Sequence, residues 1–331
     1  MKKAIITFLS LLAVSGMLPV SAYAQELIVG GQAVGIRIST KGVIVAGVTS
    51  VQTDDGERTP ASDAGIAVGD IITAINGSEV NGAAEFVDTV AALAGAPAEL
   101  KITRAEGELC VTVQPVCSCD GQWMMGMWLR DGISGIGTVT FCDPETGIYG
   151  ALGHSISDSE SGLTLPLSGG VICGAEIVSV MPGEQGKPGE LNGCTDSARV
   201  LGTITENTEQ GIYGAMDKLP EGSVMETGEV EPGPASILCT VEGGECREFS
   251  VTVDRVYRET GGVRLQLTVT DPELCGITGG IVQGMSGSPV VQNGRLVGAV
   301  THVFVSDPKK GYGIGIDSML TTAGLCAEQA A

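Results

Sequence analysis

Residues that commonly bind metal ions or nucleic acids are scarce in this sequence of 331 residues. Besides its ten cysteines, the sequence has only two histidines, His154 and His302, that could act as metal ligands. Cys117 and Cys119 also lack the usual Cys-x-x-Cys spacing of a zinc site, so we expect neither a metal nor another cofactor. Basic residues number 18 against 39 acidic ones, which gives a net charge of −21. Because an acidic surface repels phosphate backbones, nucleic acid is not an expected partner.

The sequence also lacks an apolar run long enough to span a membrane. At the N-terminus, Lys2 and Lys3 precede an apolar stretch from Ala4 to about Pro19, which is shorter than the roughly 20 residues that cross a bilayer. Ala22-Tyr23-Ala24 then has the small-x-small pattern that a signal peptidase requires. We therefore predict that residues 1–24 are a cleaved signal peptide and that the mature protein acts outside the cytoplasm.

Glycine, in contrast, is abundant. The 50 glycines are about twice the usual share of roughly 7%. They separate short runs of valine, isoleucine and threonine, a pattern that predicts turns between strands and a mainly β fold. The even number of cysteines in a chain predicted to be exported favours disulfides, and Cys239 and Cys246 flank a turn that they would close.

Residues 25–115 have the pattern of one small domain. An alternating strand, Val68–Ile75, ends in Asn76-Gly77, which is typical of tight hairpin turns because both positions tolerate positive φ. Apolar residues at helical spacing then predict an amphipathic helix over Ala83–Ala94. Two further strand-like segments before residue 115 would complete a sheet.

This domain resembles a PDZ domain of the bacterial protease type. The resemblance rests on the motifs Ala61–Ile66, Val68–Ile72 and Ile75–Gly77. In that family an apolar-Gly-apolar loop opens the ligand groove, and Val34, Gly35 and Ile36 stand in the matching place. The resemblance implies that the backbone N–H groups of this loop capture the free C-terminal carboxylate of a peptide, while the adjoining strand edge pairs with that peptide.

The segment Gly280–Val291 has the features of a serine nucleophile loop. A serine hydroxyl is a weak nucleophile, so it needs a base within hydrogen-bond reach and donors for the developing oxyanion. Gly284 and Gly287 flank Ser286 and allow a sharp turn, in which the N–H groups of Gly284 and Ser286 form an oxyanion hole. A strand, an Asn-Gly hairpin and a second strand follow. This order resembles the nucleophile loop of chymotrypsin-like proteases, which fold as a double β-barrel.

The catalytic base must be one of the two histidines. His154 follows a glycine-rich strand end, Tyr149–Gly153, and has the small Ser155 beside it, so we assign His154 as the base. His302 lies in Gly298–Val305, the strand after the nucleophile hairpin. Since this strand forms the substrate-binding edge in chymotrypsin-like folds, His302 is a candidate peptide-binding residue.

The second domain, residues 116–331, is similar throughout to the stage IV sporulation protein B peptidases of spore-forming bacteria. The segments that carry this resemblance are Trp128–Asp131, Gly135–Phe141, Tyr149–His154, Gly279–Pro289 and Gly298–Val305. The resemblance implies a secreted, self-processing signalling peptidase. It would act in the forespore intermembrane space and cleave a membrane-protein regulator of sigma-factor processing.

Several aspartates are candidates for the carboxylate that orients the histidine. The spacing of digestive chymotrypsin-like enzymes nominates Asp196 or Asp217, and Asp158 lies only four residues beyond His154. The sporulation family instead implies an aspartate shortly before the serine, which matches Asp271. We follow the closer family and assign Asp271 to this role.

Two other functions fit parts of the sequence. The chain would also suit a catalytically weak scaffold whose PDZ-like domain recruits partners, or a general envelope quality-control protease with a similar serine loop. Quality-control proteases of that type carry their PDZ domains after the protease, so the domain order here disfavours them. The sequence therefore favours a serine endopeptidase that acts on protein substrates.

Overall fold

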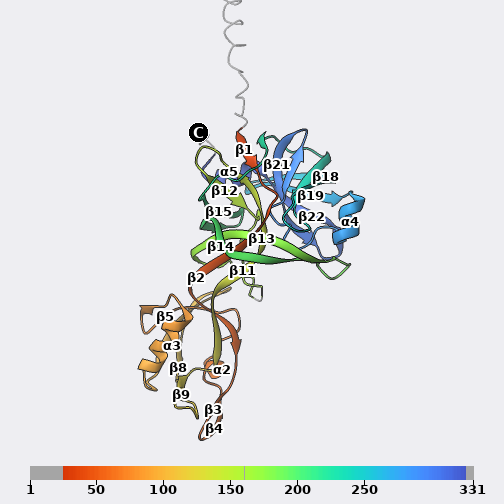
Figure 1. The fold of residues 1–331 in the computed structure, drawn as a ribbon. Coiled ribbons are helices and arrows are strands. Elements are labelled where there is room, and N and C mark those ends of the chain that lie inside the picture. The colour runs from red at the N-terminus through yellow and green to blue at the C-terminus, as the bar shows by residue number, and fades with distance from the viewer. Residues whose placement is uncertain (1–24, 160, 326–331) are drawn as a thin grey trace, which may run out of the picture.

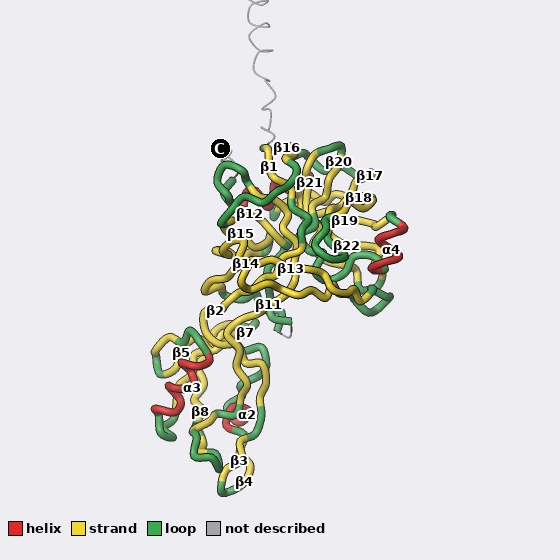
Figure 2. Tube along the Cα trace, viewed as in Figure 1, coloured by secondary structure: helices red, strands yellow, loops and turns green. Residues whose placement is uncertain are grey.

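The computed structural model describes residues 25–159 and 161–325 and consists mainly of β-strands (Figures 1 and 2). Figure 1 shows a larger upper body and a smaller lower body, joined by the strands β2 (Ala33–Val48) and β11 (Met127–Cys142). The predicted mainly β fold is confirmed. The predicted signal peptide, residues 1–24, lies outside the described residues.

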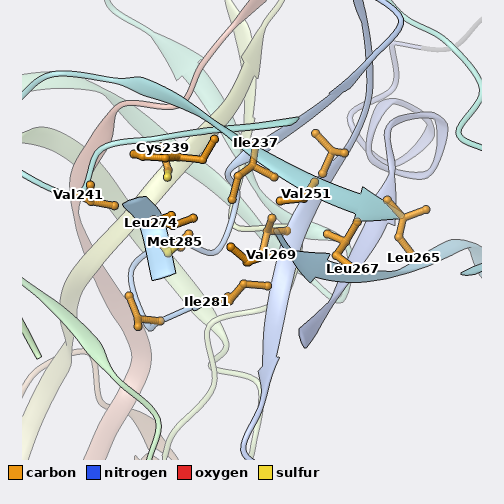
Figure 3. Packing of buried hydrophobic residues seen from close by; sticks show 14 of the residues in the cluster. Ile237, Cys239, Val241, Val251, Leu265, Leu267, Val269, Leu274, Ile281 and Met285 are labelled. Atoms are coloured by element: carbon orange, nitrogen blue, oxygen red, sulfur yellow. The ribbon is translucent and has the colours of Figure 1, made fainter. Parts of the chain in front are cut away.

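The C-terminal part of the larger body is a closed barrel of antiparallel strands. Its strands follow the order β17 (Gly233–Cys239), β18 (Arg247–Glu259), β19 (Gly262–Val269), β22 (Asp307–Gly315), β21 (Arg295–Phe304) and β20 (Pro289–Gln292), and β20 pairs again with β17. Apolar residues such as Ile237, Val251 and Leu267 fill its interior, together with Leu274 of helix α4 (Pro272–Thr278) (Figure 3). This barrel carries the predicted nucleophile loop between α4 and β20.

A second ring of strands forms the rest of the larger body. From β11 the order is β12 (Ile148–Ala151), β15 (Gly211–Met216), β14 (Glu190–Thr208), β13 (Leu167–Met181) and β2, and β2 pairs back with β11. On the other side of β11 lie β1 (Glu26–Val29) and β16 (Val224–Glu226). Phe141 of this ring packs with Leu296 of the closed barrel and with Met319 of α5 (Ile316–Thr322). The predicted double barrel is confirmed.

The smaller body has its own core between a sheet and helix α3 (Ala83–Ala92). Its remaining elements are β3 (Val51–Thr53), β4 (Gly56–Arg58), α2 (Pro60–Asp63), β5 (Ile71–Ile75), β6 (Ser78–Glu79), β7 (Ala98–Arg104), β8 (Gly107–Val113), β9 (Val116–Cys117) and β10 (Trp123–Met124). Phe86 and Val90 of α3 pack with Ile72 and Leu100 of the sheet. The predicted helix is present, as is the turn at Asn76-Gly77, where both residues have positive φ.

The boundary between the two bodies differs from the predicted one. We expected residues 25–115 to form the smaller domain alone, but β1 and residues 33–40 of β2 belong to the larger body, where they pair with β11 and β13. Conversely, residues 127–130 of β11 pair with the outer half of β2 inside the smaller body. The reason is strand length: β2 and β11 have 16 residues each and run from one core into the other.

The nine described cysteines are free thiols, contrary to the disulfides favoured by their even number. Cys239 is buried in the closed barrel, whereas Cys246 Sγ lies 4.0 Å from Gly30 O. Within residues 25–159 and 161–325, no helix is long and apolar enough to cross a membrane.

Candidate active site

Ser286 lies where the two barrels meet, and both of them fix the backbone around it. Met285 anchors the loop because its side chain is buried in the core of the closed barrel (Figure 3). From β11 of the other barrel, Thr138 N–H donates to Ser286 O (3.0 Å) and Thr138 Oγ1 donates to Gly284 O (2.9 Å). Sequence reasoning missed Thr138, because nothing local marks one threonine of a strand as a partner of a loop far along the chain.

The backbone on either side of Ser286 requires glycine, as the sequence predicted. Gly284 and Gly287 have φ of 97° and 94°, a region that side chains disfavour. A Cβ at Gly287 would lie 2.0 Å from Thr138 O and 2.5 Å from Leu152 N, so no side chain fits there. The sharp turn predicted for this loop is therefore present.

The N–H groups of Gly284 and Ser286, which we assigned to the oxyanion hole, have no hydrogen-bond acceptor within the part of the chain that the structure describes. The N–H groups of their neighbours are satisfied. Met285 donates to Val282 O (3.1 Å) and Gly287 donates to Val300 O (2.8 Å). These two N–H groups are therefore available to donate hydrogen bonds to the negative charge that develops on a substrate carbonyl oxygen.

His154 follows the end of β12, where the chain turns sharply. Leu152 and Gly153 both have left-handed backbones, with φ of 67° and 70°. A Cβ at Gly153 would come within 2.9 Å of Thr301 Cγ2, which explains the glycine before the histidine. His154 Nδ1 lies 2.8 Å from Ser155 O. A carbonyl oxygen only accepts, so Nδ1 carries the hydrogen and Nε2 is left to accept a proton.

The two histidines lie side by side. Their ring centroids are 4.5 Å apart, with the planes tilted by 37°. Burial lowers the pKa of His154. Burial also lowers the pKa of His302 to about 4, because a positive charge there would lose hydration and be repelled by a protonated His154 and by Arg264. The side chain of His302 still reaches solvent. Both imidazoles are therefore neutral near pH 7, as a general base must be.

Ser286, His154, His302 and Gly284 all line one cavity of about 420 Å³. The rest of its wall is mostly apolar. Its larger aliphatic residues are Ile36, Ile133, Ile136, Leu152, Ile156, Ile281, Val282, Val303 and Val305, which come from both barrels and the loop after His154. The structure therefore brings the predicted nucleophile, base and cleft histidine together in one site between the barrels.

The third member of the predicted triad is not in this site. Asp271 caps the N-terminus of α4: its Oδ1 accepts hydrogen bonds from Glu273 N–H (2.9 Å) and Leu274 N–H (3.1 Å), and its Oδ2 accepts one from Ser250 N–H (3.2 Å). Our assignment of Asp271 as the orienting carboxylate is therefore wrong for this structure. The reason is that a carboxylate at a helix start satisfies N–H groups that have no partner within the helix.

The rival aspartates do not replace it, since none of Asp158, Asp196 and Asp217 lines the cavity that holds Ser286 and His154. Asp158 pairs with Arg130, and Asp196 accepts a hydrogen bond from Ala198 N–H (3.0 Å). Within the described residues, the hydrogen-bond partner of His154 is the carbonyl of Ser155, a backbone group that no sequence pattern could indicate. Ser286 Oγ in turn donates to Thr301 O (2.6 Å). The serine must therefore rotate away from this carbonyl before His154 can take its proton.

The predicted carboxylate-binding loop is also absent. Val34, Gly35 and Ile36 lie near the start of β2, paired on one side with β11 and on the other with β13. Such a segment has no free edge for a peptide, so this assignment is wrong. The physical reason is that the chain does not turn after Ile36 but continues as one strand to Val48, with both edges of residues 34–36 already paired. Ile36 instead lines the active-site cavity.

The groove of the smaller domain is occupied by the chain itself. Residues Met127–Arg130 of β11 pair with the outer half of β2, and Leu129 packs into the core that contains Phe86 of α3. Asp131 accepts a hydrogen bond from the N–H of Ala83, the first residue of α3. A PDZ domain adds a peptide strand to a sheet edge beside a helix. Here residues 127–131 hold that place.

Comparisons with known proteins agree with the two-domain assignment. Residues 121–320 match the family model of SpoIVB peptidase S55, and residues 53–104 match a PDZ domain. No curated protein matches the chain. The inactive form of the Mycobacterium tuberculosis protease Rv3671c is 13% identical with a TM-score of 0.36, over 57% of this chain and 84% of that one. Its active form is 14% identical with a TM-score of 0.34, over 75% and 88%.

The peptidase match covers more than half of the sequence, and its bounds include His154, Asp271 and Ser286. The PDZ match falls wholly within the smaller body. Together they confirm the resemblance on which the sequence assignment rested. The chain is a serine peptidase with an N-terminal PDZ domain and belongs to the SpoIVB peptidase S55 family.

Proposed function

We propose that this protein is an endopeptidase that cleaves extended polypeptides with Ser286 as nucleophile and His154 as base. One observation carries the proposal. The two residues line the same cavity, beside two backbone donors, at Gly284 and Ser286, that lack an acceptor within the described residues. A nucleophile, a base and an oxyanion site in one cleft are the parts that acyl transfer needs.

The chemistry follows from the protonation of His154. Ser286 Oγ attacks the carbonyl carbon of the peptide bond while His154 Nε2 takes the hydroxyl proton. The N–H groups of Gly284 and Ser286 stabilise the oxyanion. His154 then gives the proton to the leaving amine as the C–N bond breaks, and water repeats the sequence to release the acyl group. Throughout, Ser155 O holds the Nδ1 hydrogen and so leaves Nε2 free to take and return the proton.

The cavity wall favours an apolar side chain next to the cleaved bond. Its larger aliphatic residues come from both barrels, and its volume of about 420 Å³ is enough for one or two substrate side chains. Charged substrate side chains would lose hydration there without gaining a partner. We therefore propose substrates that are cleaved at apolar residues.

Membership of the family supports a further proposal about the setting. We propose that the protein is exported and acts in the forespore intermembrane space, where it cleaves itself and a membrane-protein regulator of sigma-factor processing. The N-terminal pattern of Lys2, Lys3 and an apolar stretch supports export.

A fluorophosphonate probe, which reacts with activated serines, tests the proposal directly. We expect the purified protein to be labelled and Ser286→Ala to be unlabelled and equally stable, since the change removes one hydroxyl. Self-processing fragments should also disappear in Ser286→Ala. Labelling or processing that persists in this variant, with other proteases excluded, would rule out Ser286 as the nucleophile.

Two observations favour a second candidate, a catalytically weak scaffold. Ser286 Oγ donates to Thr301 O, and within the described residues no carboxylate bonds to His154. The same probe separates the two functions. A folded wild-type protein that reacts with the probe no faster than Ser286→Ala would be a scaffold.

A further inference from the structure

The strand that fills the PDZ groove also holds the loop that follows His154. Arg130, at the end of the groove segment, forms an ion pair with Asp158. Asp158 is only 1% exposed, and its Oδ1 accepts hydrogen bonds from Ser161 N–H (2.9 Å) and Ser161 Oγ (3.0 Å). A buried carboxylate requires such partners, so this contact holds Asp158 and Ser161 against the part of β11 that pairs within the smaller body.

A loop of the PDZ domain packs against the same turn. Gly69, in one of the motifs that carry the PDZ resemblance, has φ of 89°. A Cβ at Gly69 would lie 2.9 Å from Ser161 Cβ and 3.2 Å from Asp158 Oδ1. Close by, Lys41 N–H donates to Pro166 O (2.8 Å). Three separate contacts therefore join the smaller body to the loop that contains the described residues 155–159 and 161–166.

The contact between the domains also includes apolar packing. Ile44 and Ile71 of the PDZ domain belong to the same buried cluster as Leu165 of the loop. The first barrel holds the loop on the other side, where Asn207 Oδ1 accepts from Ile156 N–H (2.7 Å) and Asn207 Nδ2 donates to Leu165 O (3.0 Å). The loop therefore lies between Asn207 of the peptidase on one side and Arg130 of β11 with Gly69 of the PDZ domain on the other.

We propose that the PDZ domain is a fixed support for the His154 loop, with Arg130, Asp158 and Gly69 as positioning residues for the catalytic base. They act through Ser155, because its carbonyl sets the tautomer of His154 and lies at the start of the supported loop. The domain does this with its own groove filled, so it needs no peptide ligand. The proposal rests on the proposed function in one respect, that His154 is the base.

Two glycines of the PDZ domain provide a matched test. Gly69→Ala and Gly77→Ala each place a side chain at positive φ, 89° and 77°, so both carry similar backbone strain. The Cβ at Gly69 would press on Ser161, whereas nothing lies within 4 Å of one at Gly77. We expect Gly69→Ala to lower kcat at least tenfold with KM nearly unchanged, and Gly77→Ala to change either constant less than twofold.

A second readout does not depend on activity. The chain has only two histidines, so NMR of protein with isotope-labelled histidine gives one set of ring signals for each, and His302→Gln assigns them. We expect Gly69→Ala to shift the His154 signals away from the pure Nδ1–H tautomer, and Gly77→Ala to leave them in place. If the wild type proves inactive, this measurement still tests the support, while the probe experiment alone decides the proposed function.

Arg130→Gln repeats the test if Gly69→Ala does not fold. It removes the ion pair with Asp158 and keeps most of the side-chain volume, so we expect the same loss in kcat and the same change in His154. The double variant with Asp158→Asn should then lose little more than either single variant. A rise in KM at constant kcat would instead mean that the domain recruits substrate. That result, or His154 signals unchanged in both Gly69→Ala and Arg130→Gln, would overturn the proposal.

Discussion

Substitutions at Asp271 distinguish between two roles for this residue, a catalytic carboxylate and a helix cap, because the two roles predict very different losses of activity. As a cap, Asp271 satisfies backbone N–H groups of α4 and of Ser250. Alanine loses these bonds and should lower the free energy of unfolding by about 1 kcal/mol, while asparagine retains an acceptor and should cost a few tenths. As a triad member, the same asparagine would lower kcat by about 10⁴, equivalent to about 5.5 kcal/mol in the activation barrier.

We therefore expect Asp271→Asn to keep its kcat within about twofold, and Asp271→Ala to melt a few degrees lower with its activity kept below the melting point. Turnover and thermal unfolding of both variants measure this. Hydrogen bonds from the N–H groups of Leu274, Ser250 and Glu273 lower the pKa of Asp271 below its ordinary value of 3.8. Its stabilisation is therefore present above that value and is lost as the pH falls through the lowered pKa. Wild type and Asp271→Ala should thus converge in stability in strong acid. A thousandfold loss of kcat in a stable Asp271→Asn would refute the cap role.

Three more outcomes follow from the geometry. His154→Ala should lower turnover by several orders of magnitude and His302→Ala should mainly change KM; reversed severities in steady-state kinetics would identify His302 as the base. Gly287→Ala should abolish probe labelling because its Cβ would lie 2.0 Å from Thr138 O, whereas Gly294→Ala, with a similar φ of 73° and open space, should label normally. In calorimetry, neither a peptide with a free C-terminus nor its amidated form should bind the filled PDZ groove, and saturable binding of either would show that residues 127–131 leave it.

The parts of the fold that the sequence predicted are those with a local cause. Glycines at Gly284 and Gly287 indicated a sharp turn around Ser286, and positive φ at both shows why no other residue serves there. The turn before His154 has the same origin at Gly153. The hairpin at Asn76-Gly77 and the helix after it were likewise visible in short stretches of sequence. In each case the conformation is determined within a few residues, so the pattern and the structure agree.

Asp271 was misassigned although its local signal was present. Aspartate followed by proline and an acidic residue is typical of a helix start, with the aspartate as cap and Pro272 in the first turn. The structure has this arrangement. The family resemblance pointed to catalysis and outweighed the local pattern. The partner that His154 does have, the carbonyl of Ser155, could not have been predicted, because every residue carries such a group and only the turn brings this one into place.

The path of β2 could not be predicted for a different reason. The sequence shows two strand-like runs, Gly35–Ile38 and Val43–Val48, but such runs do not say whether they join or which strands lie beside them. Val34–Ile36 and residues 44–48 belong to one strand with partners in two domains. A domain boundary read from motifs falls between elements, whereas here two strands cross it. The filled groove follows from the same pairing, since β11 accompanies β2 across the boundary.

The pairing of β11 with β2 links the PDZ groove to both halves of the catalytic site. Near its start, β11 places Arg130 against Asp158 in the loop of the base. Further along, Thr138 of the same strand binds the backbone of Ser286 and Gly284. Because side chains alternate along a strand, a shift of one residue in the inner pairing would turn the Thr138 side chain away from Gly284 O. The pairing of β11 with β2 shifts in register between Arg130 and Gly132, so the outer residues of β11 hold Arg130 in the smaller body while the inner residues hold Thr138 beside the nucleophile loop.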